Sequence, residues 1–587
     1  MKKYFIFFAV LPVIAAACSQ KDVLPVEEPQ EQIIQEEEQQ PAATVVYIEA
    51  KGDDTKAAIS GTDGSFSWSA GDQIAVYAGG YKLSDGLATG GAASATFAFS
   101  GDNVLNEADR ADFAVFPASL VFDGTSVRSG SASNHSASAL TVTLPASYNL
   151  ADVQGDNFPV PMIAANAPNG GLAFKNICAL LRVTVNNVPK DTRRIEFDFG
   201  GKKVQGEFTL TGVTAGTTAA VTSSTAGSDD IITVLTPGFD TFGNLTVSLP
   251  VPTGVASSQE YTDVVITSYD AATGGHKINA ITTPVKASGA WVPGRTSARR
   301  LTANLPVFSI SAEKKVVFAP GNLQAVLGDA MIGTVNSNGH YFWGAKSWQF
   351  APNQYTVIGN TAENRLENPA ENQVIDLFSW IGKSKGYTDD RRFGIYVFAS
   401  GSGTTGGTGN TMEEEKLADW GENEIGAYQA NTWRTLAGAD WDYVLASADR
   451  SKTRFTKIVL TLTSEPLTTV NGLIIFPDQY THPLSDEFAN INRTGVTFAA
   501  GGSISLADWA LLEAAGCVFL PSAGMRTYSN GRVISDNEKA VYWTTTASSS
   551  SASQAMALYG TDNGLQTSGY SRARYYGAAV RLVRDVN

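Results

Sequence analysis

The stretch LAFKNICALL, residues Leu172–Leu181, decides the fold of this chain. It is mostly apolar and opens a series of short β-branched segments that are separated by turn residues, whereas long helical periodicity is missing around it. Such a pattern is typical of β-sandwiches. Because similar segments also precede the stretch, strands are expected on both sides of it.

The expected strands occupy short segments throughout the first half of the chain. Before the opening stretch we expect them at residues 44–50, 95–99, 112–116 and 140–144. After it we expect them at residues 180–185, 194–199, 206–211, 231–235, 245–249, 263–268 and 301–305.

Two cysteines lie in apolar strings. Cys178 belongs to the opening stretch, and Cys517 belongs to the string AGCVFL. Free cysteine behaves as a small hydrophobic residue and is often buried, so two buried thiols in separate modules are expected. The alternative is a disulfide between them, which would require the two modules to approach closely.

Length, charge and composition limit the class of protein. With 587 residues the chain is too long for one hydrophobic core, so several domains are expected. The net charge of -15, the 56 glycines and the charged fraction of only 17% indicate an extracellular protein built mainly from strands. Since an acidic chain is repelled by phosphate backbones, nucleic acid is not an expected partner.

The N-terminal segment predicts export. Lys2 and Lys3 precede a mostly apolar run to residue 14, and small residues lead to Cys18. This is the layout of a secretory signal, and the run is too short to span a bilayer, which takes about 20 apolar residues. A cysteine at this place resembles a bacterial lipobox, which implies lipid on Cys18 and anchoring in the outer membrane. The alternative is an ordinary signal peptide that contains a cysteine.

Residues 19–43 form a tether between this signal, residues 1–18, and the first strand. The segment is rich in Glu, Gln and Pro. It cannot bury enough apolar area to offset the loss of chain entropy, so disorder is expected. An acidic stretch soon after the lipidated cysteine resembles the surface-export signals of Bacteroidetes lipoproteins, which implies a surface-exposed protein.

The first half of the chain resembles the fimbrillin family of pilin-like surface proteins. Three strings carry the resemblance in this order: FSWSAGDQI at residues 66–74, FAVFPA at residues 113–118, and the opening stretch. The resemblance covers residues 44–304. It implies two fimbrillin-like β-sandwich domains, at residues 44–170 and 171–305.

The fimbrillin resemblance also implies a mode of assembly. In that family, proteolysis after a basic residue removes the first strand, and a strand of a neighbouring subunit fills the groove, so that main-chain hydrogen bonds join the subunits. Here residues 44–50 would be the removed strand. Lys51 and Lys56 are the candidate processing residues, because no arginine precedes Arg110.

The second half of the chain, residues 306–587, resembles the C-type-lectin-like modules of Bacteroidetes surface proteins. The strings that carry the resemblance lie at residues 316–324, 433–441, 472–478, 519–524, 542–545 and 577–583. It implies an α+β module in which the terminal strands pair and long loops bind ligands. Helices are expected at residues 433–447, with Thr432 as N-cap, and at residues 506–515, with Ser505 as N-cap. The end of the chain is expected to return to strands at residues 540–545, 555–559 and 577–583.

Two loops of this module are rich in the side chains that recognition surfaces favour. Tyr and Arg are enriched in such surfaces, and the loops lie at residues 524–532 and 569–576. The candidate ligand-binding residues are Arg526, Tyr528, Asn530, Tyr570, Arg572, Arg574 and Tyr575. The alternative is that both are ordinary solvated loops that hold the fold together.

Several chemistries are not expected. The four histidines are scattered without the spacing of a helical zinc site. The Gly-rich run at residues 401–409 lacks the βαβ unit of a dinucleotide site.

Many animal lectins bind calcium and sugar through a triplet of an acidic residue, a proline and an asparagine. Glu367-Asn368-Pro369 contains these residue types in a different order, so it does not support calcium-dependent sugar binding. Formylglycine-generating enzymes share the lectin-like fold but need reactive cysteines, and an apolar string raises the pKa of Cys517.

The expected protein is therefore not an enzyme. It is a fimbrillin-like surface lipoprotein that serves as a pilus tip adhesin. It accepts a strand from another subunit and donates none, because residues 580–585 close the C-terminal module. Its expected ligand is a glycan or a host or bacterial surface protein. The alternative is a lipid-anchored, glycan-binding surface protein that does not polymerise.

Overall fold

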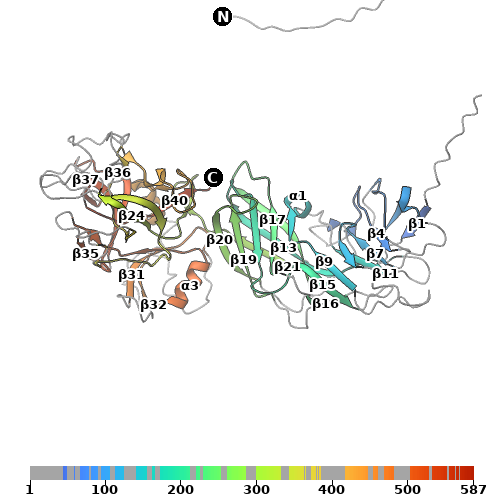
Figure 1. The fold of residues 1–587 in the computed structure, drawn as a ribbon. Coiled ribbons are helices and arrows are strands. Elements are labelled where there is room, and N and C mark those ends of the chain that lie inside the picture. Colours follow the sequence, from blue (N-terminus) through green and yellow to red (C-terminus); the bar gives the residue numbers. More distant parts are fainter. Residues whose placement is uncertain are drawn as a thin grey trace, which may run out of the picture. The chain divides into compact units, whose positions relative to one another are not determined.

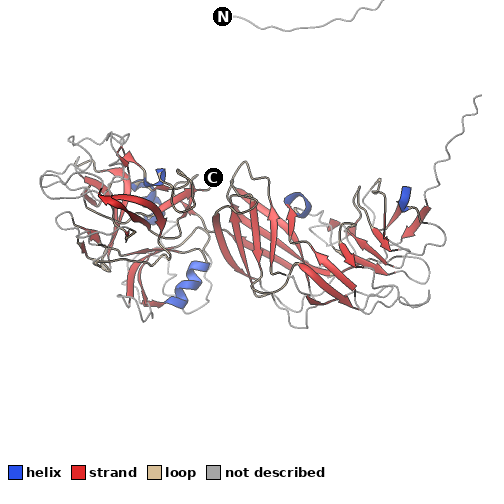
Figure 2. Ribbon diagram, in the orientation of Figure 1, coloured by secondary structure: helices blue, strands red, loops and turns tan. Residues whose placement is uncertain are grey.

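The computed structural model is mostly β (Figure 2). It divides into residues 1–43 and a compact unit formed by residues 44–587. The structure describes residues 44–48, 58–59, 66–77, 81–89, 94–105, 113–123, 140–154, 161–165, 172, 174–211, 220–224, 229–252, 261–285, 299–331, 343–361, 364, 372–378, 380, 383–384, 417–446, 454–459, 469–480, 503–527, 532–551, 554–561, 564–567, 569–574 and 576–587. The predicted signal, Cys18, the tether, Lys51 and Lys56 lie outside these residues. Among the described helices, none is long and apolar enough to cross a membrane.

The first sheet is buried on both faces. Its order is β12-β11-β7-β4-β5, with β4 at Ala75–Tyr77, β5 at Tyr81–Leu83, β7 at Phe113–Phe116, β11 at Met162–Ala165 and β12 at Lys175–Asn176. Phe113 and Val115 pack into one core, whereas Ala114 and Phe116 pack into another. Successive side chains of a strand point to opposite faces, so the unbroken apolar run of β7 follows from burial on both sides.

One face of this sheet packs against a second sheet, in the order β16-β15-β9-β8. Its strands are β8 at Val121–Asp123, β9 at Leu140–Leu144, β15 at Gly206–Thr211 and β16 at Ala220–Ser224. Leu144 and Phe208 from this sheet meet Phe113 and Cys178 in the shared core. The other face packs against Trp68, which contacts Phe97, Phe116 and Phe174 edge-on with ring centroids 4.9 to 5.6 Å apart.

Phe97 belongs to β6, Ala95–Phe99, which pairs antiparallel with the first strand, β1, Thr44–Ile48. Short pieces complete this region: β2 at Ala58–Ile59, β3 at Phe66–Ser67, and a 3-10 turn at Gly101–Asn103. The segment FSWSAGDQI thus contributes Trp68 and Ile74 to the core beneath β6.

A second sandwich follows in the chain (Figure 1). One sheet has the order β10-β17-β14-β19-β20 and the other has the order β18-β13-β21. The strands are β10 at Ser147–Asn149, β13 at Cys178–Val188, β14 at Arg194–Asp198, β17 at Ile231–Leu235, β18 at Gly243–Pro252, β19 at Asp263–Tyr269, β20 at Lys277–Pro284 and β21 at Arg299–Asn304, with a short helix α1 at Leu150–Val153. The two sheets share one apolar core.

The central strand β13 belongs to both sandwiches. Cys178 at its start lies in the core of the first sandwich, and Leu181, Val183 and Val185 lie in the core of the second. The pairing also crosses residue 170 elsewhere, because β9 pairs with β15 and β10 pairs with β17. The sheets therefore exchange strands across the predicted domain boundary.

The segment from residue 306 onward begins and ends in one sheet, in the order β22-β23-β40-β29. Its strands are β22 at Phe308–Ser309, β23 at Lys315–Phe318, β29 at Arg434–Thr435 and β40 at Leu582–Asp585. The remaining strands are β24 at Leu323–Met331, β25 at Trp343–Phe350, β26 at Val374–Ile375, β27 at Lys383–Ser384, β28 at Leu417–Ala418, β30 at Arg454–Val459, β31 at Thr469–Ile475, β32 at Ser503–Ser505, β33 at Val518–Pro521, β34 at Met525–Arg526, β35 at Val533–Ile534, β36 at Ala540–Ala547, β37 at Gln554–Thr561, β38 at Gly564–Gln566 and β39 at Ser571–Ala573.

The two expected helices of this segment differ in outcome. Helix α3, Leu506–Ala514, begins where predicted, because the Ser505 hydroxyl accepts from the Asp508 N–H and the Asp508 carboxylate accepts from the Ser505 N–H. Helix α2, Gly438–Ala446, begins at Gly438 and not at Trp433. Residues 434–435 instead form β29 and pair with β40, so the prediction for the start of this helix was wrong.

The final strand also starts later than predicted. Residues 577–579 make only isolated bridges to distant segments, and β40 begins at Leu582. Both Cys178 and Cys517 are buried free thiols, as expected, and burial raises the pKa of each.

The substitution Leu181→Ala tests the role of β13. The side chain is fully buried in the second core, so its loss should reduce the free energy of unfolding by about 2–5 kcal/mol in chemical denaturation followed by circular dichroism. Leu511→Ala is the matched control, since Leu511 is 40% exposed, and its effect should stay within about 0.5 kcal/mol. Equal effects of the two substitutions would contradict this role for β13.

Candidate functional site

The segment expected to be a Tyr- and Arg-rich loop is partly a strand. β39 pairs antiparallel with β37, in the register Gln554↔Ala573 and Met556↔Ser571. The Ser571 hydroxyl donates to Gln554 Oε1 at 2.8 Å. Pairing with β37 fixes the backbone direction of residues 571–573, and so determines which of the neighbouring side chains reach the surface.

Tyr570 and Arg572 form a stack with Tyr559 of β37. The rings of Tyr559 and Tyr570 are parallel with centroids 4.0 Å apart, and the Arg572 guanidinium lies 4.1 Å from the centre of the Tyr570 ring. Such a cation–π contact stabilises both groups and holds the arginine in place. Tyr570 is 8% exposed, whereas Tyr559 and Arg572 are half-buried. We refer to these three residues as the Tyr559–Arg572 stack.

Burial raises the pKa of Tyr570 to about 12. The phenol is therefore neutral throughout the physiological range, and the Arg572 charge is not cancelled by a phenolate. The stack presents one fixed positive charge beside an aromatic edge, which is an arrangement suited to acidic or aromatic groups on a ligand.

Arg574 has a structural role. It is 4% exposed, and its guanidinium lies 4.4 Å from the centre of the Trp380 ring. Its Nε donates to the Gln554 carbonyl at 3.2 Å, and the Trp380 indole donates to the Thr544 carbonyl at 2.7 Å. The guanidinium therefore joins β37 to the segment around Trp380 and is not available at the surface.

The structure places Arg526, one of the predicted ligand-binding residues, in the interior. Its side chain is 0% exposed. The guanidinium donates to the Leu377 carbonyl at 3.2 Å, to the Asp376 carbonyl at 2.6 Å, and to the side chain and carbonyl of Asn364. Arg526 thus binds two segments that are far from it in sequence, around Asn364 and at Asp376–Leu377, and its neighbour Asp376 is also buried.

The remaining candidates, Tyr528, Asn530 and Tyr575, lie outside the described residues and stay predictions. Sequence reasoning did not find Tyr559, Trp380 or Gln554. All three lie in other segments than the loop at residues 569–576. Strand pairing brings Tyr559 and Gln554 of β37 to this loop, and a backbone hydrogen bond from the Trp380 N–H to the Arg574 carbonyl brings Trp380 to it.

A second feature with functional meaning is the pairing of the first strand. β1 pairs with β6 alone, with Val46 opposite Phe97 and Thr44 opposite Phe99, and these two strands form a separate sheet in the described part of the chain. Phe97 and Phe99 are buried against Trp68. Loss of β1 would therefore leave the backbone of β6 unpaired along an edge next to a formed core.

The last strand is held differently. β40 pairs with β23 on one side and with β29 on the other. The Arg434 guanidinium also donates to both oxygens of Asp585, at 2.9 and 3.0 Å. Unlike β1, this strand cannot leave without breaking two ladders.

Among the described side chains, no group of three or more His, Cys, Asp or Glu residues could hold a metal ion. The described residues form a mostly β protein of mainly antiparallel sheets with a half-buried arginine–tyrosine stack. No family model matches the chain, and no curated protein matches it.

Some solved structures are similar in fold over about half of the chain. One is described as a "putative cell adhesion protein" of Bacteroides uniformis, with 18% identity, a TM-score of 0.23, and coverage of 43% of this chain and 89% of that one. Another is the C-terminally truncated tip fimbrial protein Mfa3 of Porphyromonas gingivalis, with 11% identity, a TM-score of 0.18, and coverage of 43% and 83%. At these values the similarity carries no argument about function.

The substitution Arg526→Met tests the structural role of Arg526. It removes the cation beside buried Asp376, so the free energy of unfolding should fall by about 3–5 kcal/mol at pH 7. Burial already raises the pKa of Asp376, and loss of the guanidinium raises it further. The folded variant then binds a proton at a pH where the unfolded chain does not, so its deficit should shrink as the pH falls toward 5.

The measurement is chemical denaturation at pH 7 and pH 5. Arg572→Met is the control, since its half-buried cation–π contact contributes about 0.5–1 kcal/mol without a pH-dependent deficit. If Arg526→Met were as stable as Arg572→Met, or equally destabilised at both pH values, the assignment would fail.

Proposed function

We propose that this protein is a surface adhesin of the fimbrillin type that can accept a strand from a neighbouring subunit. The observation that carries the proposal is the pairing of β1 with β6 alone, above the core that contains Trp68. When β1 leaves, an extended segment of a partner can pair with β6 and regain the same main-chain hydrogen bonds. Alternate side chains of that segment would fill the positions opposite Phe97 and Phe99.

The proposal makes the chain an acceptor and not a donor. β40 is held in two ladders and by the Arg434–Asp585 ion pair, so its release would be costly. An acceptor without a donor strand suits the tip of a polymer. The ligand of such a tip would be a glycan or a surface protein, bound at the Tyr559–Arg572 stack.

The second candidate is a surface protein that stays as a monomer on its lipid anchor and binds glycans. One observation favours it: β1 occupies its own groove, with five register pairs between residues 44–48 and 95–99. In a chain that keeps β1, the edge of β6 that β1 covers is already paired and cannot accept a partner strand, and Cys18 would then retain its lipid.

N-terminal sequencing of the mature surface protein separates the two candidates. Processing for assembly should give a start after Lys51 or Lys56, and the double substitution Lys51→Ala with Lys56→Ala should then abolish high-molecular-weight polymers in unboiled gel samples. Lys82→Ala is the control, because it removes a half-buried lysine of β5, which lies beyond the first strand. A mature protein that retains lipid on Cys18 would rule out the processed form and favour the monomer.

The substitution Arg572→Ala tests the ligand surface. Its loss removes the only cation of the stack, so binding of the full chain to its ligand, found on an array of glycans and surface proteins, should weaken about tenfold, which corresponds to ~1.4 kcal/mol. Arg300→Ala, on the second sandwich, should leave binding unchanged. Unaltered binding by Arg572→Ala would show that the surface lies elsewhere.

A further inference from the structure

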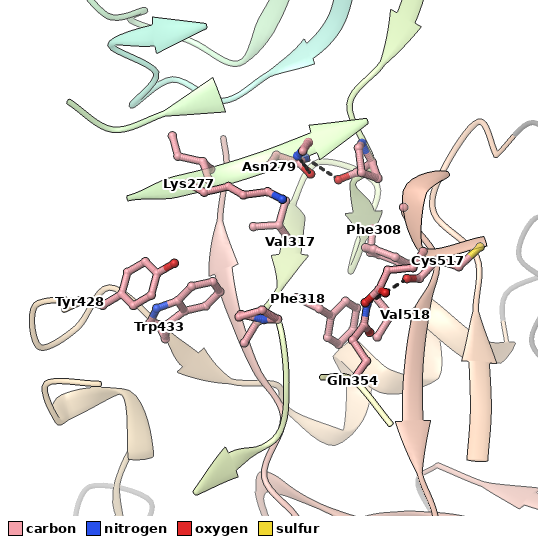
Figure 3. Close-up of a pocket in the computed structure, with 17 residues that line it drawn as sticks. Lys277, Asn279, Phe308, Val317, Phe318, Gln354, Tyr428, Trp433, Cys517 and Val518 are labelled. Atoms are coloured by element: carbon pink, nitrogen blue, oxygen red, sulfur yellow. Dashed lines mark hydrogen bonds between the residues drawn. The ribbon is translucent and has the colours of Figure 1, made fainter. Parts of the chain in front are cut away.

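A cavity of about 260 Å³ lies between β20 and the segment from residue 306 onward (Figure 3). The Tyr559–Arg572 stack contributes no residue to its lining, so it is separate from the proposed adhesive surface. In liquid water each molecule occupies about 30 Å³, so the cavity has room for more than one water molecule. The cavity lies just below the range of about 300–1,000 Å³ that small-molecule pockets occupy, which restricts it to a small ligand.

Aromatic side chains form much of its wall. Phe308 and Phe318 meet edge-on with centroids 4.9 Å apart, and Tyr428 and Trp433 meet edge-on at 5.3 Å. Val317 also lines the cavity, but its side chain is buried with Ile278 and Val307 and not with these rings. These contacts fix the rings, so the wall exists before a ligand arrives and binding would not need to order it.

One buried donor in this wall has no acceptor. Trp433 is 4% exposed, and among the described residues its indole N–H finds no hydrogen-bond partner. A buried donor without a partner costs about 1–3 kcal/mol. An acceptor atom on a bound molecule would remove this cost.

Two opposite charges lie at the cavity: Lys277 on β20 and Glu513 on α3, both exposed. No ion pair joins them, and among the described residues the Lys277 ammonium has no hydrogen bond. Burial lowers the pKa of Lys277, and the Glu513 carboxylate opposes this effect. The cavity thus offers one cation and one anion that can both contact a ligand.

Gln354 holds the acidic side of the cavity in place. Its Nε2 donates to Glu513 Oε1 at 2.9 Å and to the Cys517 carbonyl at 3.3 Å, while its Oε1 accepts from the Phe519 N–H at 2.9 Å and from buried Arg581 at 2.6 Å (Figure 3 draws Gln354 and its bond to Cys517). All four positions of the amide are used. It therefore serves to position Glu513 and leaves the ligand contacts to other groups.

The two walls are also fixed against each other. A Cβ added to Gly516, at φ +85°, would lie 2.1 Å from Pro306 Cβ, so only glycine allows this approach. Asn279 Nδ2 donates to the Pro306 carbonyl at 2.6 Å. The cavity is therefore built into the junction of β20 with the rest of the chain.

We propose that this cavity binds a free α-amino acid with an apolar side chain, such as leucine or phenylalanine. The carboxylate accepts hydrogen bonds from Lys277 and the Trp433 indole, and the ammonium group binds the Glu513 carboxylate. The side chain packs on Phe308 and Phe318. A neutral sugar would leave both charges unused, and a simple anion would be repelled by Glu513, so the zwitterion fits the charges best.

The test is calorimetric titration of the full chain with L-leucine and L-phenylalanine, alongside a thermal-shift measurement. Both should bind and raise the melting temperature. N-acetyl-leucine and leucine methyl ester, which each lack one charge, should bind at least tenfold more weakly. Glucose and glucuronate serve as sugar probes. The amino acids are tested up to 10 mM, which detects binding with a dissociation constant of about 1 mM. The proposal fails if neither amino acid binds at that concentration. It also fails if the derivatives or the sugars bind as well as the amino acids do.

Variants assign the binding to this cavity. Trp433→Phe keeps the ring and removes the N–H, while Lys277→Met and Glu513→Gln each remove one charge; each should weaken amino-acid binding at least fivefold. Lys314→Met and Glu424→Gln are matched controls at exposed positions that do not line the cavity, and they should bind as the unaltered protein does. Unaltered binding in all three cavity variants would place the amino acid elsewhere and overturn the proposal.

Discussion

The structure depends on one strand that must fit two cores at the same time. β13 begins at Cys178 among the side chains of the first sandwich and continues into the second, and its ladder with β18 is regular from Cys178 to Val185. Its alternating side chains must therefore match the packing of both sandwiches, and a shift of one residue would turn every buried side chain outward. The adjoining strand β21 pairs with it in parallel, which places the start of the C-terminal segment directly after the second core.

Sequence patterns predicted local structure well where burial is periodic. The strands at residues 95–99, 140–144, 206–211 and 231–235 have the predicted bounds, and Ser505 caps α3 because its hydroxyl and Asp508 lie within one turn. The patterns did not show which strands pair across residue 170, because antiparallel partners such as β9 and β15 carry no mark of each other in their composition. Pairing is decided by tertiary packing, which lies beyond the range of a local pattern.

The candidate surface shows the same limit at the level of single side chains. Arg526 and Arg572 lie in similar Tyr-, Ser- and Arg-rich strings, yet one is fully buried and the other stands on a tyrosine ring. The difference comes from Asn364, Asp376 and Leu377, whose polar atoms close around Arg526. A guanidinium has five donors in a fixed plane, so convergent carbonyls can hold it inside a protein at a modest cost. Local composition alone does not distinguish that case from a binding surface.

The parallel pairing of β13 with β21 has a mechanical consequence. Tension applied between the start of β13 and the end of β21, at Asn304, pulls these two strands in opposite directions along their length. The six residue pairs between Leu181↔Arg299 and Asn186↔Asn304 are then loaded in shear, so they resist together and do not open one after another. A side-chain hydrogen bond of 2.8 Å from Asn186 to Asn304 closes the end of this ladder. The ladder between β13 and β21 thereby resists separation of these two strands more strongly than a ladder that opens one pair at a time.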